Sequence, residues 1–87
     1  MTAPEITVVR LRCWLRETRV RAKISQQVAA DIMGVPQNQV HRIESGANPL
    51  TVSMFLRLAQ ALDIDPLDAL AAATHSEMTA ASRDIAV

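Results

Sequence analysis

Aromatic residues, glycine and cysteine are all scarce in this chain. Its 87 residues include one Trp, one Phe, no Tyr, two Gly and one Cys, although 49% of them are hydrophobic. Strands are typically rich in aromatic and β-branched residues, whereas alanine and leucine favour helices. An apolar fraction with many alanines and leucines and so few aromatics therefore predicts a single all-α domain with a modest core.

The single cysteine, Cys13, cannot form an internal disulfide, so nothing requires an oxidising compartment. Residues 1–5 show no basic segment followed by an apolar stretch, and the apolar runs are far shorter than the roughly 20 residues of a membrane helix. We therefore expect a cytoplasmic protein.

The sequence also shows no pattern typical of a metal-binding or catalytic site. Cys13, His41 and His75 lack the spacing of metal ligands. No catalytic triad, glycine-rich phosphate loop or paired carboxylates are recognisable. We expect no metal, no cofactor and no enzymatic activity.

The formal net charge of zero results from an uneven distribution. Residues 1–57 carry eight Lys and Arg against four Asp and Glu, whereas residues 58–87 carry one against five. A phosphate group responds to the nearby surface rather than to the total charge, so the basic part is compatible with nucleic acid. The plain alternative is that the six basic residues within 10–23 form a solvated helix face.

Hydrophobic periodicity with start and stop signals predicts five helices. Ser25, Thr51 and Asp65 are suited to begin helices, and Gly34 and Gly46 are suited to end them. Pro36 fits the first helical position. The expected helices cover residues 6–22, 26–33, 36–45, 52–62 and 66–73.

Apolar spacing predicts the buried faces of two of these helices. In the first helix the inward stripe is expected to contain Val8, Leu11, Leu15, Thr18 and Ala22, with Trp14 packed against the last helix. The basic residues of this helix are expected to lie mostly outside: Arg10, Arg12, Arg16 and Arg21. In the fourth helix the buried stripe is expected to contain Val52, Phe55, Leu56, Ala59 and Leu62.

Residues 25–46 have the length and order of a helix-turn-helix, two short helices joined across Gly34 and Val35. Ala30 falls where the two helices would cross, and its small side chain permits close approach. The apolar contacts between the helices are expected from Val28 or Ala29, together with Met33, Val35, Val40 and Ile43.

The outward face of the second of these helices carries Gln37, Asn38, His41 and Arg42. They form two pairs at a spacing of four residues and therefore share one side of the helix. Amides can pair bidentately with adenine, and arginine with guanine, in the major groove. A face with two amides, an imidazole, a guanidinium and no carboxylate indicates recognition of base edges.

The ordered string from Arg19 to Gly46, together with residues 58–64, resembles the Xre/Cro/phage-repressor (Cro/C1-type) helix-turn-helix family. The resemblance spans about residues 10–72 and is most specific at Ser25-Gln26, Ala30, Gly34-Val35, Val40 and Ile43-Glu44-x-Gly46. It implies an all-α, five-helix lambda-repressor-like domain. It also implies that a homodimer binds double-stranded DNA with the third helix in the major groove.

The resemblance also implies roles for individual residues. Base-reading positions fall on Gln37, Asn38 and Arg42, with Gln39 and His41 as lesser candidates. Contacts to the DNA backbone fall on Ser25 and Gln26, and Arg19 with Glu44 occupies the place of an internal ion pair.

The chain departs from the family pattern at two places and in its low charge. Pro36 stands where a serine or threonine cap is usual, and residues 47–50 lack the basic residues common there. We therefore expect phosphate contacts from backbone amides, Asn48, Lys23 or Arg21, and modest affinity for non-specific DNA.

We divide the chain into a helix-turn-helix domain, residues 6–73, and a tail, residues 74–87. Three outcomes stay open for the tail: it frays, extends the last helix, or orders against a partner. Leu67, Leu70 and Ala71 are candidates for a dimer contact, and core burial is an equal alternative for Leu67.

The leading hypothesis is a dimeric repressor that blocks polymerase sterically at a palindromic operator. An alternative is an antitoxin that binds DNA and neutralises a toxin through its tail. A third is a protein-interaction module that has lost DNA binding.

Overall fold

The computed structural model describes residues 4–74. It contains α1 (Pro4–Arg21), α2 (Gln26–Met33), α3 (Gln37–Ser45), α4 (Val52–Ala61) and a fifth helix over residues 66–74. The five helices, with no strand within this range, confirm the predicted all-α class. The proposed tail lies outside the described residues from His75 onward, so its three outcomes stay predictions.

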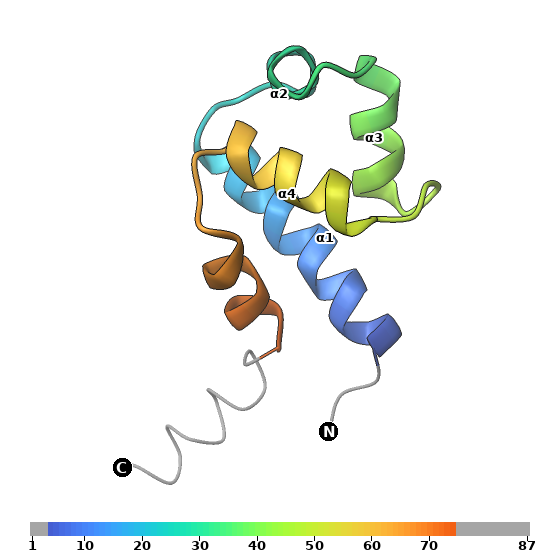
Figure 1. Ribbon diagram of the computed structural model, residues 1–87, viewed down its shortest axis with the longest axis vertical. Helices are drawn as coiled ribbons and strands as arrows, with labels where there is room; N and C mark the ends of the chain where they lie inside the picture. Colours follow the sequence, from blue (N-terminus) through green and yellow to red (C-terminus); the bar gives the residue numbers. More distant parts are fainter. Residues whose placement is uncertain (1–3, 75–87) are drawn as a thin grey trace, which may run out of the picture.

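The helices pack around one core (Figure 1). α2 contacts both α3 and α4, and α1 contacts α3. The fifth helix follows α4, and it borders a hollow with α1 in which Trp14 lies beside Ala72 and Ala73. None of the helices within residues 4–74 is long and apolar enough to cross a bilayer.

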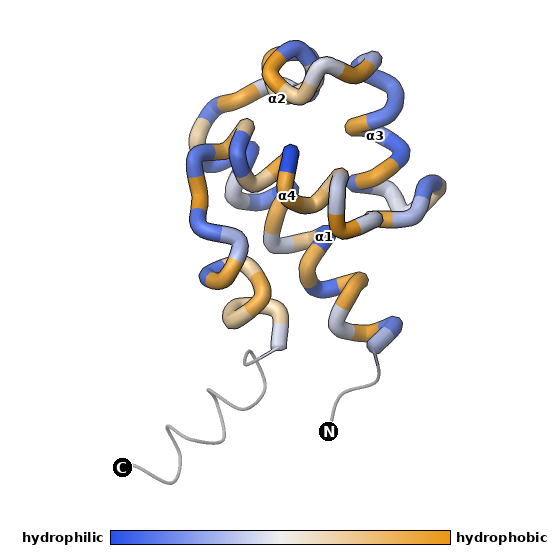
Figure 2. The backbone as a smooth tube through the Cα atoms, viewed as in Figure 1, coloured by the Kyte–Doolittle hydropathy of each residue, from blue (hydrophilic) through white to orange (hydrophobic). Residues whose placement is uncertain are grey.

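The core draws side chains from every helix, and its largest fully buried members are Leu15, Val40, Ile43 and Leu58. Each aliphatic side chain of this kind contributes about 1.5–3 kcal/mol when it leaves water. In Figure 2 α4, which crosses the middle of the view, is mostly hydrophobic, whereas α3 is mostly hydrophilic along its length. The core is therefore formed with only part of the α3 surface, which leaves the rest for another role.

Side-chain caps begin two of the four labelled helices as predicted. The Ser25 hydroxyl accepts a hydrogen bond from the Val28 amide at 3.1 Å, and the Thr51 hydroxyl accepts one from the Met54 amide at 3.1 Å. Pro36 differs from the prediction, because it is the N-cap residue of α3 and not its first helical residue. Its ψ of 149° is extended, and no side-chain hydrogen bond caps this helix.

The predicted buried stripe of α4 is wrong at two positions. Val52 is 74% exposed and Leu56 is 48% exposed. Leu58 and Ala61 are buried instead, together with Phe55 and Ala59. Apolar residues occur on both sides of Phe55, so two stripes at helical spacing fit the sequence, and packing selects the one that includes Leu58.

The inward face of α1 also differs from its prediction in part. Leu11 and Leu15 are buried, but Val8 is 37% exposed, and Ala22 is exposed beyond the end of the helix. Arg19 takes the next buried position on this face, at 8% exposure. The buried stripe therefore ends with a charged side chain, which needs a partner.

Candidate nucleic-acid interface

α2 and α3 meet at a short corner, residues 34–36. Gly34 adopts a left-handed conformation (φ 74°, ψ 33°) and ends α2. Ala30 is completely buried, so its small side chain lets the two helices approach. Of the two alternatives on α2, Ala29 is buried and Val28 is 47% exposed, so Ala29 belongs to the core.

One face of α3 points into the core and the other into solvent. Val40 and Ile43 are 1% and 2% exposed, and they fix the rotation of α3 about its axis. The four residues predicted for the outward face are all exposed: Gln37, Asn38, His41 and Arg42. The structure therefore brings these four polar side chains to one surface.

Gln39 lies differently from these four residues. It is half-buried, and its Nε2 atom donates a hydrogen bond to the sulfur of Met54 on α4 at 3.4 Å. Gln39 is therefore at the edge of the outward face, with its amide turned toward α4.

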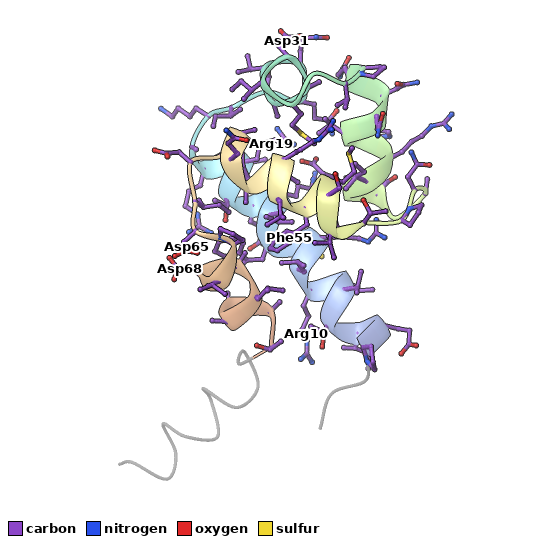
Figure 3. All side chains as sticks on the ribbon, viewed as in Figure 1. Arg10, Arg19, Asp31, Phe55, Asp65 and Asp68 are labelled. Carbon is purple, nitrogen blue, oxygen red and sulfur yellow. The ribbon has the colours of Figure 1, made fainter. Side chains whose placement is uncertain are left out.

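Arg19 and Glu44 form a two-point ion pair between α1 and α3. The Nε atom of Arg19 lies 2.6 Å from Oε2 of Glu44, and Nη2 lies 2.9 Å from Oε1. Arg19 also donates to the carbonyl of Ile24 through Nη1 at 2.8 Å. In Figure 3 Arg19 points into the space among the helices. Each of the three guanidinium nitrogens therefore has a hydrogen-bond partner in a site with little solvent.

The ion pair is linked to the exposed face of α3 through Gln26. The Nε2 atom of Gln26 donates to Oε1 of Glu44 at 3.0 Å, and its Oε1 atom accepts from Nε2 of Gln37 at 3.4 Å. A carboxylate only accepts hydrogen bonds, so Glu44 fixes which end of the Gln26 amide faces inward. Gln26 in turn presents an acceptor to Gln37. The sequence indicated the ion pair but not this chain of amides.

The residues predicted to contact the DNA backbone lie at the start of α2 and in the loop after α3. Ser25 and Lys23 are exposed beside the start of α2, and Gln26 and Asn48 are half-buried. The Asn48 amide donates to the carbonyl of Arg42 at 3.1 Å, which ties the loop after α3 to that helix.

A polar hollow of about 300 Å³ lies between α1, α2 and α3. It is lined by Arg16, Arg19, Gln26, His41, Glu44 and Ser45. Arg16 is exposed, and sequence reasoning placed it only on the outer face of the first helix. Its position near His41 follows from the packing of α1 against α3 and has no local sequence signal.

Arg12 is a second residue that sequence reasoning misplaced, because it was expected to lie mostly outside. It is half-buried, and its Nη1 atom donates to the carbonyls of Ile43 and Asn48. These partners are 31 and 36 residues away in the sequence. No periodicity or short motif indicates a contact over that separation.

The three dimer candidates lie on one exposed face of the fifth helix. Leu67 is 70% exposed, Leu70 is 38% exposed and Ala71 is exposed. The core alternative for Leu67 is therefore wrong within the described residues, because Ala69 and Ala73 are the buried residues of this helix.

Comparison with known proteins agrees with this geometry. Residues 15–68 match the model of a helix-turn-helix family. The high-resolution crystal structure of the restriction-modification controller protein C.AhdI from Aeromonas hydrophila matches with a TM-score of 0.66 and 32% identity. The match covers 71% of this chain and 94% of that one. A search of curated proteins found no match.

The fold and its exposed α3 face define a helix-turn-helix protein. The chain belongs to the Cro/C1-type helix-turn-helix family. It is a DNA-binding transcriptional regulator.

Proposed function

We propose that this protein is a repressor that binds a two-fold-symmetric operator as a homodimer, with α3 in the major groove. The observation that carries the proposal is the exposed α3 face, where Gln37, Asn38 and Arg42 lie together without an acidic side chain. The major groove of B-DNA admits a helix and displays a distinct pattern of donors and acceptors for each base pair.

The chemistry of this face fits base edges. The amides of Gln37 and Asn38 can each donate to N7 and accept from N6 of adenine, and Arg42 can donate twice to guanine. The bond between Gln26 and Gln37 holds one of these amides in place before DNA arrives. His41 lies on the same face, and Gln39 has a lesser role because its amide is engaged by Met54.

Contacts to phosphates are proposed around the start of α2 and the loop after α3. The Ser25 oxygen accepts from the Val28 amide, which leaves its hydroxyl hydrogen available to a phosphate oxygen. Gln26 keeps one amide hydrogen beyond its bond to Glu44. Lys23 and Asn48 complete the set. Such contacts set the register of the protein on DNA and add no sequence information.

The homodimer is proposed to form through Leu67, Leu70 and Ala71. Their spacing of three and four residues places them on one side of the fifth helix, and all three are exposed. A two-fold dimer uses the same patch on both subunits and matches a palindromic operator. We treat residues 6–73 as the DNA-binding domain and residues 74–87 as a C-terminal tail.

The mechanism is steric exclusion of polymerase by the bound dimer. The structural neighbour is described as a controller protein of a restriction-modification system, which supports a role in the control of gene expression.

Selection of bound duplexes from a random-sequence pool tests the proposal. We expect a two-fold-symmetric motif with half-sites about 10 base pairs apart, one turn of DNA. The logarithm of the affinity should fall linearly with the logarithm of the salt concentration, by about 0.9 for each phosphate neutralised. Equal binding to all duplexes at low ionic strength would reject a sequence-specific function.

The Arg42→Ala variant tests the α3 face directly. We expect a loss of about 1–3 kcal/mol on the selected duplex, which corresponds to roughly 5–150-fold in affinity. The matched control is Arg57→Ala on α4. Arg57 is also exposed, and its replacement by alanine removes the same charge. Circular dichroism should show the wild-type helix content for both variants.

A further inference from the structure

Arg12 connects α1 to two backbone segments that follow each other in the chain. Its Nη1 atom donates to the carbonyl of Ile43, in the last turn of α3, and to the carbonyl of Asn48 at 2.8 Å, in the loop before α4. Helix ends leave their last carbonyls without partners inside the helix, and a cation there is favoured by the helix dipole. The guanidinium of Arg12 therefore meets two carbonyls at the negative end of α3.

Arg12 and Arg19 hold α3 from the same helix at two different places. They are separated by seven residues, or two turns of α1, and so lie on one side of it, about 10 Å apart along its axis. Arg19 holds the Glu44 side chain, and Arg12 holds the Ile43 carbonyl and the loop. A single attachment would leave α3 able to pivot, whereas two separated attachments restrict its direction.

The Ile43 carbonyl is next in the chain to Arg42, whose own carbonyl accepts the Asn48 amide at 3.1 Å. The backbone that carries the Arg42 side chain is therefore held by two hydrogen bonds. One joins the Ile43 carbonyl to α1, and the other joins the Arg42 carbonyl to the loop. A recognition side chain has to be held within about 0.5 Å of its productive position by its supporting contacts. Displacement of this turn would change where the Arg42 guanidinium reaches in the groove.

We infer that Arg12 is a positioning residue for DNA recognition, which fixes the carboxy-terminal turn of α3 and the following loop against operator DNA without touching a base. This inference rests on the proposed sequence-specific function. It assigns to Arg12 a contribution to specificity that is separate from its charge.

The test compares Arg12→Gln with Arg57→Gln. Both changes remove one positive charge, and the side chain of Arg57 forms no hydrogen bond or ion pair within residues 4–74. The probes are the duplex selected by the wild-type protein and a scrambled duplex of the same length. We expect Arg12→Gln to bind the selected duplex about tenfold more weakly than Arg57→Gln does, as the loss of charge-assisted hydrogen bonds suggests. The two variants should bind the scrambled duplex equally.

Two further variants separate positioning from stability. Arg12→Lys keeps a donor and a positive charge, so it should restore part of the lost affinity for the selected duplex. In the Arg12→Gln background, Arg42→Ala should cost less affinity than it does in the wild-type background, because Arg42 is already displaced. Additive losses would overturn the inference. Unfolding of Arg12→Gln in thermal denaturation would also overturn it, because Arg12 would then serve stability.

Amide hydrogen exchange in the DNA-free protein provides a readout that does not depend on an operator. We expect the amides of Gly46 and Asn48 to exchange faster in Arg12→Gln than in Arg57→Gln, since the loop loses its bond to α1. If the wild-type protein selects a duplex and Arg12→Gln binds it as Arg57→Gln does, only the inference about Arg12 fails. If the wild-type protein selects none, the proposed function fails and the inference about Arg12 fails with it.

Discussion

Arg19 and Glu44 are 25 residues apart in the sequence and form a bidentate ion pair whose side chains are 9% and 3% exposed. Removal of one partner from a buried pair leaves the other charge without compensation. Arg19→Ala is therefore expected to lower the free energy of unfolding by about 3–5 kcal/mol. Urea denaturation followed by circular dichroism measures this loss, with the exposed Arg16→Ala as the control on the same helix. Equal stability of the two variants would contradict a structural role for the pair.

A double substitution separates the contribution of Glu44 to stability from its contribution to DNA binding. Replacement of both partners by apolar residues of similar size, Arg19→Met with Glu44→Leu, should leave stability near that of the wild-type protein. Operator affinity should still fall, because Gln26 loses the acceptor that orients its amide.

A double-mutant cycle tests whether Gln26 orients Gln37. Each of Gln26→Ala and Gln37→Ala should weaken binding to the selected duplex, and the double variant should lose less than the sum by about 0.5–1.5 kcal/mol. The reason is that either change removes the bond of 3.4 Å between the two amides. Gln26→Ala with Asn38→Ala is the control pair, and its losses should add. Additive losses in the first cycle would show that the two amides act independently.

The side-chain cap of α2 by Ser25 is expected to contribute to the stability of the protein. Ser25→Ala removes the acceptor of the Val28 amide, and about 1 kcal/mol of stability should be lost. Ser25→Asp should retain most of it, because a carboxylate also accepts from this amide and opposes the positive end of the helix dipole. Chemical denaturation compares these variants with Ser53→Ala, whose side chain is exposed within α4. A loss of the same size at Ser53 would remove the cap as the explanation.

The dimer proposal predicts a change of mass in solution. Leu67→Glu places a charge on the exposed face of the fifth helix without entering the core, since Leu67 is 70% exposed. Sedimentation equilibrium should then show a monomer, with wild-type helix content and weaker operator binding. The control is Val20→Glu, an exposed apolar residue of α1 at 56%. Dissociation of the Val20 variant alone would place the interface on α1.

Local signals predicted most of the fold. Ser25, Thr51, Gly34 and Gly46 act within a few residues of themselves, so their effect on helix ends is readable from the sequence. The predicted α4 face was partly wrong because apolar residues flank Phe55 on two sides of the helix, and only packing against the other helices distinguishes Leu58 from Leu56.

The residues of the candidate site were also predicted only in part from the sequence. Periodicity alone placed Gln37, Asn38, His41 and Arg42 on one surface, and resemblance to a family indicated the pair of Arg19 and Glu44. The bonds from Arg12 and from Gln26 join segments that meet only after folding. Side chains with such distant partners carry no local pattern, so a three-dimensional structure was needed to find them.

The left-handed residues within residues 4–74 fall into two groups, one that has a torsional cost and one that does not. Lys23 (φ 60°) and Asp63 (φ 55°) lie just beyond α1 and α4. This region costs a side chain such as that of Lys23 about 1–2 kcal/mol, and it costs the short polar side chain of Asp63 less. Gly34 and Gly46, the two glycines of the sequence, adopt it without that cost. A Cβ atom built at either glycine would meet nothing within 4 Å, so backbone handedness and not space limits substitution there. The helix proposed to enter the groove is therefore bounded on both sides by relaxed corners, and the strained corners lie at the ends of helices that support it.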